Sequence, residues 1–194
     1  MRSDRLRVGE RVAVLTEIVR QTGEIGRTSL MKMVYLLQTV KKVPLGYDFE
    51  LYLYGPYSAQ VLDDLSIAVF WGALQEEYYS TRNGYGYRIT LGGSAKNPPQ
   101  NEQIRRSRTE PYKEAVRWVV EKFKNYTASE MEAVGTLVWI DREVRDNRET
   151  LSMDKLLDIA VEIKPNFPRE GFQQLAEKLV EEGILIHVQP LHPI

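Results

Sequence analysis

The sequence has 194 residues, of which 43% are hydrophobic and 27% charged, a mixture typical of a folded globular chain. Its 26 basic and 27 acidic side chains give a formal net charge of −1, which excludes a uniformly basic nucleic-acid-coating protein but not a local basic patch. There is no cysteine, and both histidines, His187 and His192, lie in the last eight residues. Disulfide frameworks, thiolate zinc sites and cysteine nucleophiles are therefore excluded, and a multi-histidine metal site is not expected.

No apolar run approaches the length of about 18 residues that a membrane-spanning helix needs, and the N-terminal residues contain no apolar signal core. We therefore expect a cytoplasmic protein with no membrane partner.

Three helices are predicted in the first 72 residues. Apolar residues recur at helical spacing in three segments, residues 8–21, 28–40 and 58–72. Residues 48–54 alternate instead between apolar and polar positions. This alternation predicts a short strand that Gly55-Pro56 ends.

A β-hairpin is predicted after the third helix. Residues 73–81 and 85–91 are two β-prone runs joined by Arg82-Asn83-Gly84, and Asn-Gly between such runs is a strong hairpin signal because both positions tolerate positive φ. Three helices followed by a hairpin is the element order of a winged helix-turn-helix, which we assign to residues 1–93.

The second half of the chain predicts a helical bundle. Residues 94–108 are polar and contain two prolines, so we interpret them as a linker. Residues 109–194 predict helices and a short terminal strand, with a T-x-x-E capping box from Thr127 to Glu130 and a helix cap at Ser152. Asp141 and Arg145 are spaced as an ordinary helix ion pair. The expected fold class is mainly α: a winged helix-turn-helix-like N-terminal module with a β-hairpin wing, packed on a C-terminal helical bundle.

Several sequence blocks resemble YwgA-like proteins. They are residues 30–38 (LMKMVYLLQ), 54–58 (YGPYS), 62–65 (LDDL) and 163–167 (IKPNF), and the match covers most of residues 10–185. The first two blocks are also similar, more distantly, to the Panacea domain of antitoxins. The resemblance implies a helical, winged-helix-like, non-enzymatic protein, and Panacea proteins neutralise toxins by protein–protein contact. It supplies no catalytic residue.

DNA binding meets an objection in the third predicted helix. A winged helix usually reads DNA with this helix, and affinity needs lysine and arginine on that surface. Residues 58–71 contain neither, but they include Asp63 and Asp64, which the predicted helix places opposite Leu62, Leu65 and Val69. The candidate nucleic-acid-binding residues lie elsewhere, namely Lys41, Lys42, Arg82 and Arg88. Solubilising charge on exposed loops is the alternative interpretation of these four.

Tyrosine is concentrated between residues 47 and 87, where eight tyrosines occur within 41 residues. Tyrosine supplies large contact area at low entropy cost and is enriched at interface hot spots. The candidate partner-binding residues are Tyr52, Tyr54, Tyr57, Tyr85 and Tyr87. Packing around the hairpin is the alternative explanation for several of them.

Two functional hypotheses follow from the sequence. The carboxylates of the adjacent residues Asp63 and Asp64 diverge by about 100° on a helix, so they do not form a catalytic acid–base pair. Because the chain also has no cysteine and only two histidines, we expect no catalytic residues, no metal and no cofactor. The first hypothesis is a non-enzymatic regulatory or adaptor protein that binds another protein, in an antitoxin-like manner. The alternative is a DNA-binding transcriptional regulator of the winged-helix type, a homodimer through its C-terminal helices.

Overall fold

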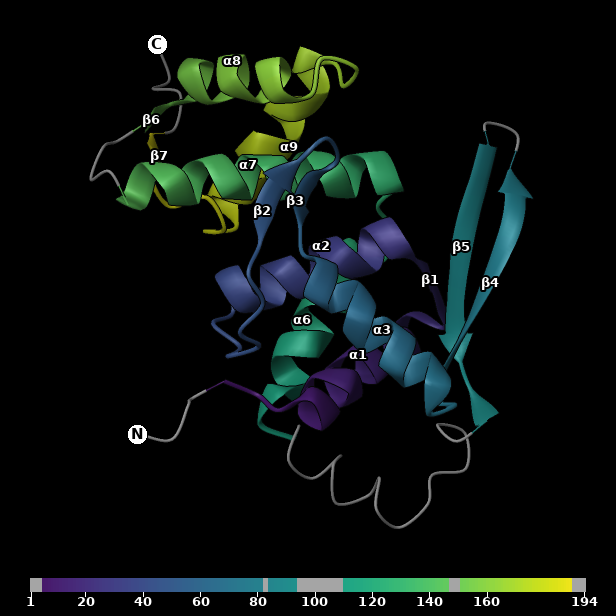
Figure 1. Ribbon diagram of the computed structural model, residues 1–194. Helices are drawn as coiled ribbons and strands as arrows, with labels where there is room; N and C mark the ends of the chain where they lie inside the picture. Colours follow the sequence, from purple (N-terminus) through teal and green to yellow (C-terminus); the bar gives the residue numbers. More distant parts are fainter. Residues whose placement is uncertain (1–4, 82–83, 94–109, 147–150, 190–194) are drawn as a thin grey trace. The chain divides into compact units, whose positions relative to one another are not determined.

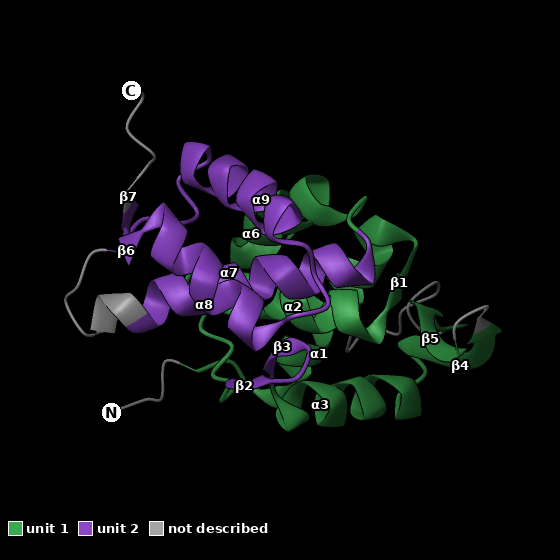
Figure 2. Ribbon diagram, turned by 90° about the horizontal axis from the view of Figure 1, so that it is seen from above, with its two compact units in different colours: residues 1–49, 58–126 green, residues 50–57, 127–194 purple. Residues whose placement is uncertain are grey.

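The computed structural model describes residues 5–81, 84–93, 110–146 and 151–189 (Figure 1). This part of the chain is mainly helical and contains a small antiparallel sheet. None of its helices is both long and apolar enough to span a bilayer. The chain divides into two compact units, each described by itself below: unit 1 comprises Met1–Phe49 and Ser58–Tyr126, and unit 2 comprises residues 50–57 and 127–194 (Figure 2).

This division differs from the predicted domain boundaries. The predicted linker, residues 94–108, lies outside the described residues. Helix α6 (Lys113–Phe123), which the sequence places in the C-terminal bundle, instead packs against the first two helices in unit 1. The physical reason is its apolar face, because Val116, Val119 and Phe123 are buried there.

Unit 1 contains the three predicted helices and the predicted hairpin. Ile18, Leu36, Leu37 and Ile89 are fully buried in its core. Its elements in chain order are α1 (Val8–Thr22), β1 (Glu24–Gly26), α2 (Arg27–Thr39), α3 (Ala59–Phe70), β4 (Leu74–Thr81), β5 (Gly84–Leu91), the 3-10 turn η1 (Glu110–Tyr112) and α6.

The sheet of unit 1 has the strand order β1-β5-β4, and both pairings are antiparallel. The hairpin runs without a bulge from the pair Leu74↔Leu91 to the pair Thr81↔Gly84, and the predicted turn residues 82–83 lie outside the described part of the chain. Strand β1 was not predicted, because its three residues are too few to show a period. It pairs with the base of β5 and so ties the hairpin to α1 and α2.

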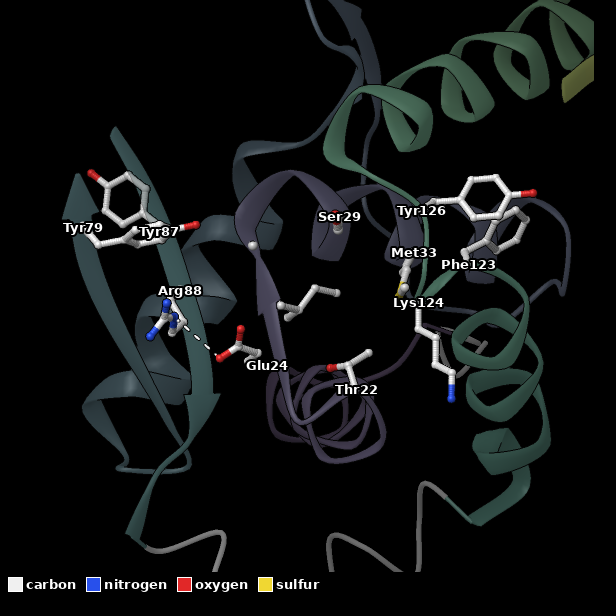
Figure 3. A pocket seen from close by; sticks show the side chains of 12 residues that line it. Thr22, Glu24, Ser29, Met33, Tyr79, Tyr87, Arg88, Phe123, Lys124 and Tyr126 are labelled. Carbon is white, nitrogen blue, oxygen red and sulfur yellow. Dashed lines mark ion pairs between the residues drawn. The ribbon is translucent and has the colours of Figure 1, made fainter. Parts of the chain in front are cut away.

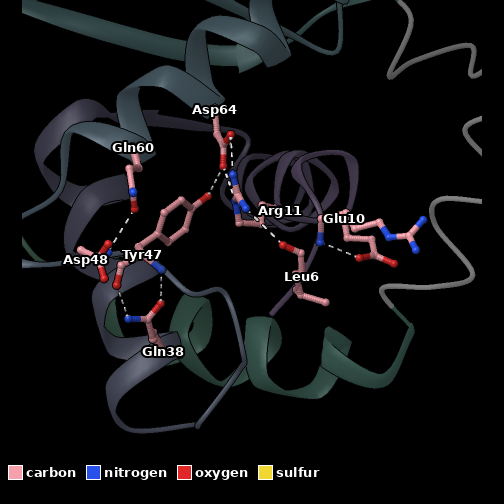
Figure 4. Close-up of polar contacts among 9 residues, drawn as sticks. Leu6, Glu10, Arg11, Gln38, Tyr47, Asp48, Gln60 and Asp64 are labelled. Atoms are coloured by element: carbon pink, nitrogen blue, oxygen red, sulfur yellow. Dashed lines mark hydrogen bonds and ion pairs between the residues drawn. The ribbon is translucent and has the colours of Figure 1, made fainter. Parts of the chain in front are cut away.

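Asp64 is buried in unit 1, which corrects the prediction that it faces solvent (Figure 4). The buried side of α3 carries Val61, Asp64, Leu65 and Ala68, while Asp63 remains exposed. The apolar residues of α3 lie on more than one face of the helix, so their spacing did not identify the face that is buried. Asp64 is buried because Arg11 of α1 pairs with it, and the spacing of residues within α3 does not show that contact.

Arg11 neutralises the buried carboxylate, and Tyr47 adds a hydrogen bond to it. The Arg11 guanidinium donates to both Asp64 oxygens at 2.6 and 3.2 Å, and the Tyr47 hydroxyl donates at 2.7 Å. The hydrogen bond with Asp64 raises the pKa of Arg11 above its ordinary value. Burial, followed by the negative charge of Asp64, raises the pKa of the Tyr47 hydroxyl. The three side chains therefore join α1, the segment after α2 and α3 as a charged, hydrogen-bonded group.

Unit 2 combines helices with two very short sheets. Its elements are β2 (Glu50–Tyr52), β3 (Gly55–Tyr57), α7 (Ala128–Asp146), β6 (Leu151–Ser152), α8 (Met153–Ile163), α9 (Arg169–Glu181) and β7 (Val188–Gln189). β2 and β3 are antiparallel, and β6 and β7 are parallel.

Two sequence predictions in unit 2 need correction. Gly55-Pro56 does not end the extended segment but begins the return strand β3. Gly55 has φ of 79°, which glycine adopts without steric cost and which allows the tight reversal. The predicted terminal strand, residues 184–188, is shorter in the structure, because the pairing with β6 that the described residues show involves Val188 and Gln189 of β7.

The predicted helix caps of unit 2 are confirmed. The backbone N–H of Thr127 donates to the Glu130 carboxylate at 2.7 Å, and the Glu130 N–H donates to the Thr127 hydroxyl at 3.2 Å. The Ser152 hydroxyl accepts from the N–H of Lys155 at 3.3 Å. Such caps replace the intrahelical bonds that a first turn lacks.

Asp141, which the sequence predicts to form an ordinary helix ion pair with Arg145, is a buried carboxylate with other partners. Its side chain is completely buried, where it accepts from the backbone N–H groups of Ile186 and His187 at 3.1 and 2.8 Å. Arg142 donates to it at 2.6 Å, and the side chain of the predicted partner Arg145 lies outside the described part of the structure. The chain after α9 returns to α7, and this long-range contact supplies the partners.

We expect Asp64→Ala to destabilise the protein by about 3 kcal/mol, because it leaves the Arg11 charge without its partner. The matched control is Asp63→Ala on the same helix, which removes an exposed carboxylate and should cost less than about 0.5 kcal/mol. Urea unfolding of both variants measures the difference. Equal losses would contradict the structural role of Asp64.

Candidate functional site

A cluster of tyrosine rings covers one face of the β4–β5 hairpin. The register places Tyr78 opposite Tyr87 and Ser80 opposite Tyr85. The rings of Tyr78 and Tyr85 stack with centroids 5.1 Å apart and planes 13° apart, and the Tyr87 ring lies 5.1 Å from Tyr78. Tyr78 is 60% and Tyr85 71% exposed. The three rings thus pack against one another, while most of the surface of Tyr78 and Tyr85 faces solvent.

Arg27 connects this cluster to the start of α2. Its guanidinium lies over the Tyr87 ring at 3.5 Å from the centroid and donates two hydrogen bonds to the Glu76 carboxylate. The hydrogen bond with Glu76 raises the pKa of Arg27. The charge of Arg27 is therefore already paired with a carboxylate of the hairpin.

The opposite face of the hairpin is organised by Tyr79. Its ring lies across Gly86, where an added Cβ would stand only 3.1 Å from the ring. Arg88 lies over the same ring at 5.1 Å and forms an ion pair with Glu24 at 3.6 Å. The glycine thus provides room for an aromatic cross-strand contact.

A pocket of about 220 Å³ lies beside the β1 side of the hairpin (Figure 3). Figure 3 shows Tyr79, Tyr87 and Arg88 on one side of it and Phe123, Lys124 and Tyr126 on the other. Cofactor and drug sites usually measure about 300–1,000 Å³, so this pocket is smaller than a usual cofactor site. The described residues include no group of three metal-ligating side chains placed to hold an ion.

The five predicted partner-binding tyrosines fall into two separate units. Tyr85 and Tyr87 belong to the hairpin of unit 1, whereas Tyr52, Tyr54 and Tyr57 belong to β2, β3 and their turn in unit 2. The hairpin cluster also contains Tyr78, which the sequence analysis did not select. The cross-strand register, a property of the folded pair, brings Tyr78 into the cluster.

The tyrosines of unit 2 surround a short apolar hairpin. Tyr52 and Tyr54 are each 62% exposed and Leu53 is 76% exposed, and the Tyr52 and Tyr57 rings lie 5.9 Å apart. The alternation predicted over residues 48–54 breaks at Leu53, which lies with Tyr54 in the turn that follows β2. Leu51, Tyr52, Leu53 and Ile163 line an open apolar hollow of about 490 Å³.

The structure does not gather the candidate nucleic-acid-binding residues into one patch. Lys41 lies over the Trp118 ring at 4.8 Å, and the Lys42 ammonium donates to the Thr39 carbonyl at 2.6 Å, both beyond the end of α2. Arg88 lies near the start of α2, opposite Gly26. The 13-residue helix between them is about 20 Å long. Arg82 lies outside the described residues.

We expect Glu76→Gln to destabilise the protein by about 1 kcal/mol, because the half-exposed Arg27 loses its bidentate carboxylate. Glu77→Gln is the matched control, since Glu77 is the exposed neighbour on the opposite face of β4. Chemical unfolding of the two variants tests the claim. If Glu77→Gln costs as much as Glu76→Gln, the bond to Arg27 is not what stabilises this face.

No family model matches this sequence, and no curated protein matches it significantly. The function must therefore be inferred from the geometry of unit 1 and unit 2 and from the sequence resemblance given above.

Proposed function

We propose that this protein is a non-enzymatic regulatory or adaptor protein that binds another protein through a winged-helix-like unit 1. The strand order β1-β5-β4 supports the winged-helix assignment. So does the chain order, because β1 lies between α1 and α2 and the hairpin follows α3 directly. In a winged helix, the strand between the first two helices completes a small sheet with the wing.

The observation that carries the proposal is the outer surface of α3. In a winged helix this is the helix that approaches DNA. Here it has no lysine or arginine, it exposes the Asp63 carboxylate, and its last residue, Phe70, is 88% exposed. A carboxylate repels phosphate groups, and an exposed aromatic ring gains its free energy from burial against another apolar surface.

The hairpin supports the same partner class. Tyr78 and Tyr85 are exposed and already stacked, so burying them costs little side-chain entropy, which is why tyrosine is enriched at interface hot spots. The two described arginines beside the hairpin, Arg27 and Arg88, are each paired with a carboxylate. Phosphate binding by these arginines would therefore compete with the carboxylates already beside them.

The resemblance to the Panacea domain supports a toxin as the class of partner. DNA binding by a winged-helix regulator is the competing function, and it requires the basic residues Lys41, Lys42 and Arg88 to contact phosphates. The aromatic turn of unit 2, with Tyr52 and Tyr54, stays a predicted second contact surface.

A photo-crosslinking amino acid placed at Tyr85 or Phe70 in the native host should capture the same discrete protein. The matched control is Arg117, an exposed position on α6, which should not capture it. The purified partner should then bind about tenfold or more weakly to Tyr85→Ser or Phe70→Ser, with Arg117→Ser unchanged, as measured by calorimetry. A partner whose affinity is unchanged by both substitutions would contradict the proposal.

Duplex DNA separates the two functions. We expect no binding at low salt in a fluorescence anisotropy titration. Salt-dependent binding that weakens in Lys41→Ala, Lys42→Ala and Arg88→Ala variants would establish the DNA-binding alternative instead.

A further inference from the structure

The outer edge of β4 is unpaired among the described residues. The order β1-β5-β4 places this eight-residue strand at one side of the sheet. Natural edge strands are commonly blocked by lysine, proline or a bulge. β4 contains neither residue type, and its register with β5 is continuous. Its backbone is therefore open to a further strand.

The hydrogen bonds of the hairpin determine which residues offer that backbone. The Gly92 N–H donates to the Ala73 carbonyl at 2.9 Å, so Ala73 and every second residue after it direct their polar groups toward β5. The intervening residues Glu76, Tyr78 and Ser80 direct N–H and C=O groups to the outer edge.

We propose that β4 pairs antiparallel with β4 of a second copy of this chain, about a twofold axis that passes through Tyr78. The pairing would join the two three-stranded sheets into one. A twofold contact between identical strands is closed and gives a dimer, because each copy uses up its own free edge.

The charges of β4 select this register. A twofold axis at Glu76 or Glu77 would set a carboxylate directly opposite its own copy, which is destabilising. With the axis at Tyr78, Glu77 faces Tyr79 and Glu76 faces Ser80. An axis beyond Tyr78 would also separate the carboxylates, but it would shorten the paired segment.

Side chains on both faces favour the same axis. On one face the two Tyr78 rings would meet as a cross-strand aromatic pair, which continues the stacks with Tyr85 and Tyr87. On the other face Glu77 of the second copy would approach Tyr79, over whose ring Arg88 lies at 5.1 Å. Glu77 of the second copy would thus add a carboxylate on the face that carries Arg88, whose ion pair with Glu24 is exposed.

This inference does not rest on the proposed function. Edge pairing uses the backbone of β4 together with the Tyr78 ring, whereas the partner experiment tests the exposed rings of Tyr85 and Phe70. Dimerisation can therefore be measured with the purified chain alone, and its failure would leave the partner experiment unaffected.

Sedimentation equilibrium should show a dimer for the unmodified chain and a monomer for Ser80→Pro. Ser80 has its N–H on the outer edge, so proline removes an intermolecular donor and spares the bonds to β5. Ser80→Ala is the matched control and should stay dimeric, and circular dichroism should show that all three chains are folded. A monomer at every concentration of the unmodified chain, or a dimer that survives Ser80→Pro, would overturn the proposal.

A single cysteine locates the axis independently of that variant, because the chain has no cysteine of its own. Tyr78→Cys should form a disulfide dimer on mild oxidation, since facing residues of a hydrogen-bonded pair stand about 5.5 Å apart, within disulfide range. Tyr85→Cys is the control, because its copies would be separated by three strand spacings, about 14 Å. Equal disulfide yields for the two variants would also overturn the proposal.

Discussion

The pairing of β1 with β5 is the contact on which the candidate site depends. Ile25 and Ile89 face one another in this pairing, and Ile89 is fully buried, so the base of the hairpin is anchored in the core of unit 1. Arg27, the first residue of α2, follows β1 immediately and therefore lies beside the hairpin, where it contacts Glu76 and Tyr87. β1 thus adds a third strand to a hairpin that also contacts α1, α2 and α3, and a three-stranded sheet packed on helices is more stable than two strands alone.

Three ion pairs are partly or fully buried in the fold. Arg11 is paired with Asp64, Arg27 with Glu76 and Lys164 with Glu132. The first two pairs belong to unit 1, where α3 carries no lysine or arginine and the hairpin exposes aromatic rings. Phe70, Tyr78 and Tyr85 are the most exposed aromatic rings in the described part of unit 1, and covering them against a protein surface would release free energy.

The hairpin combines two properties that are usually opposed. Its faces expose aromatic rings that are already ordered, and its outer edge leaves backbone donors and acceptors unpaired. Edge strands of this kind are normally protected against association. Two acidic residues remain on β4, and they would allow some pairing registers while penalising others. The proposed dimer would use the edge of β4 with the Tyr78 ring, and the proposed partner would use the rings of Tyr85 and Phe70.

The sequence by itself determined the helices, the hairpin and the caps of unit 2, because each depends on residues close in the chain. Apolar spacing located α1, α2 and α3, Asn83-Gly84 located the hairpin, and Thr127 with Glu130 located the start of α7. Part of the candidate site was also visible, since Tyr85 and Tyr87 were selected from the local density of tyrosine and their place in the predicted hairpin. The tertiary structure decided the rest. It buries Asp64 beside Arg11, and it brackets Asp141 with backbone donors from the chain after α9. It also places Tyr78 in the ring cluster and α6 in unit 1. Each of these depends on a partner distant in sequence, and local periodicity carries no information about which distant side chain completes a buried charge or an aromatic stack.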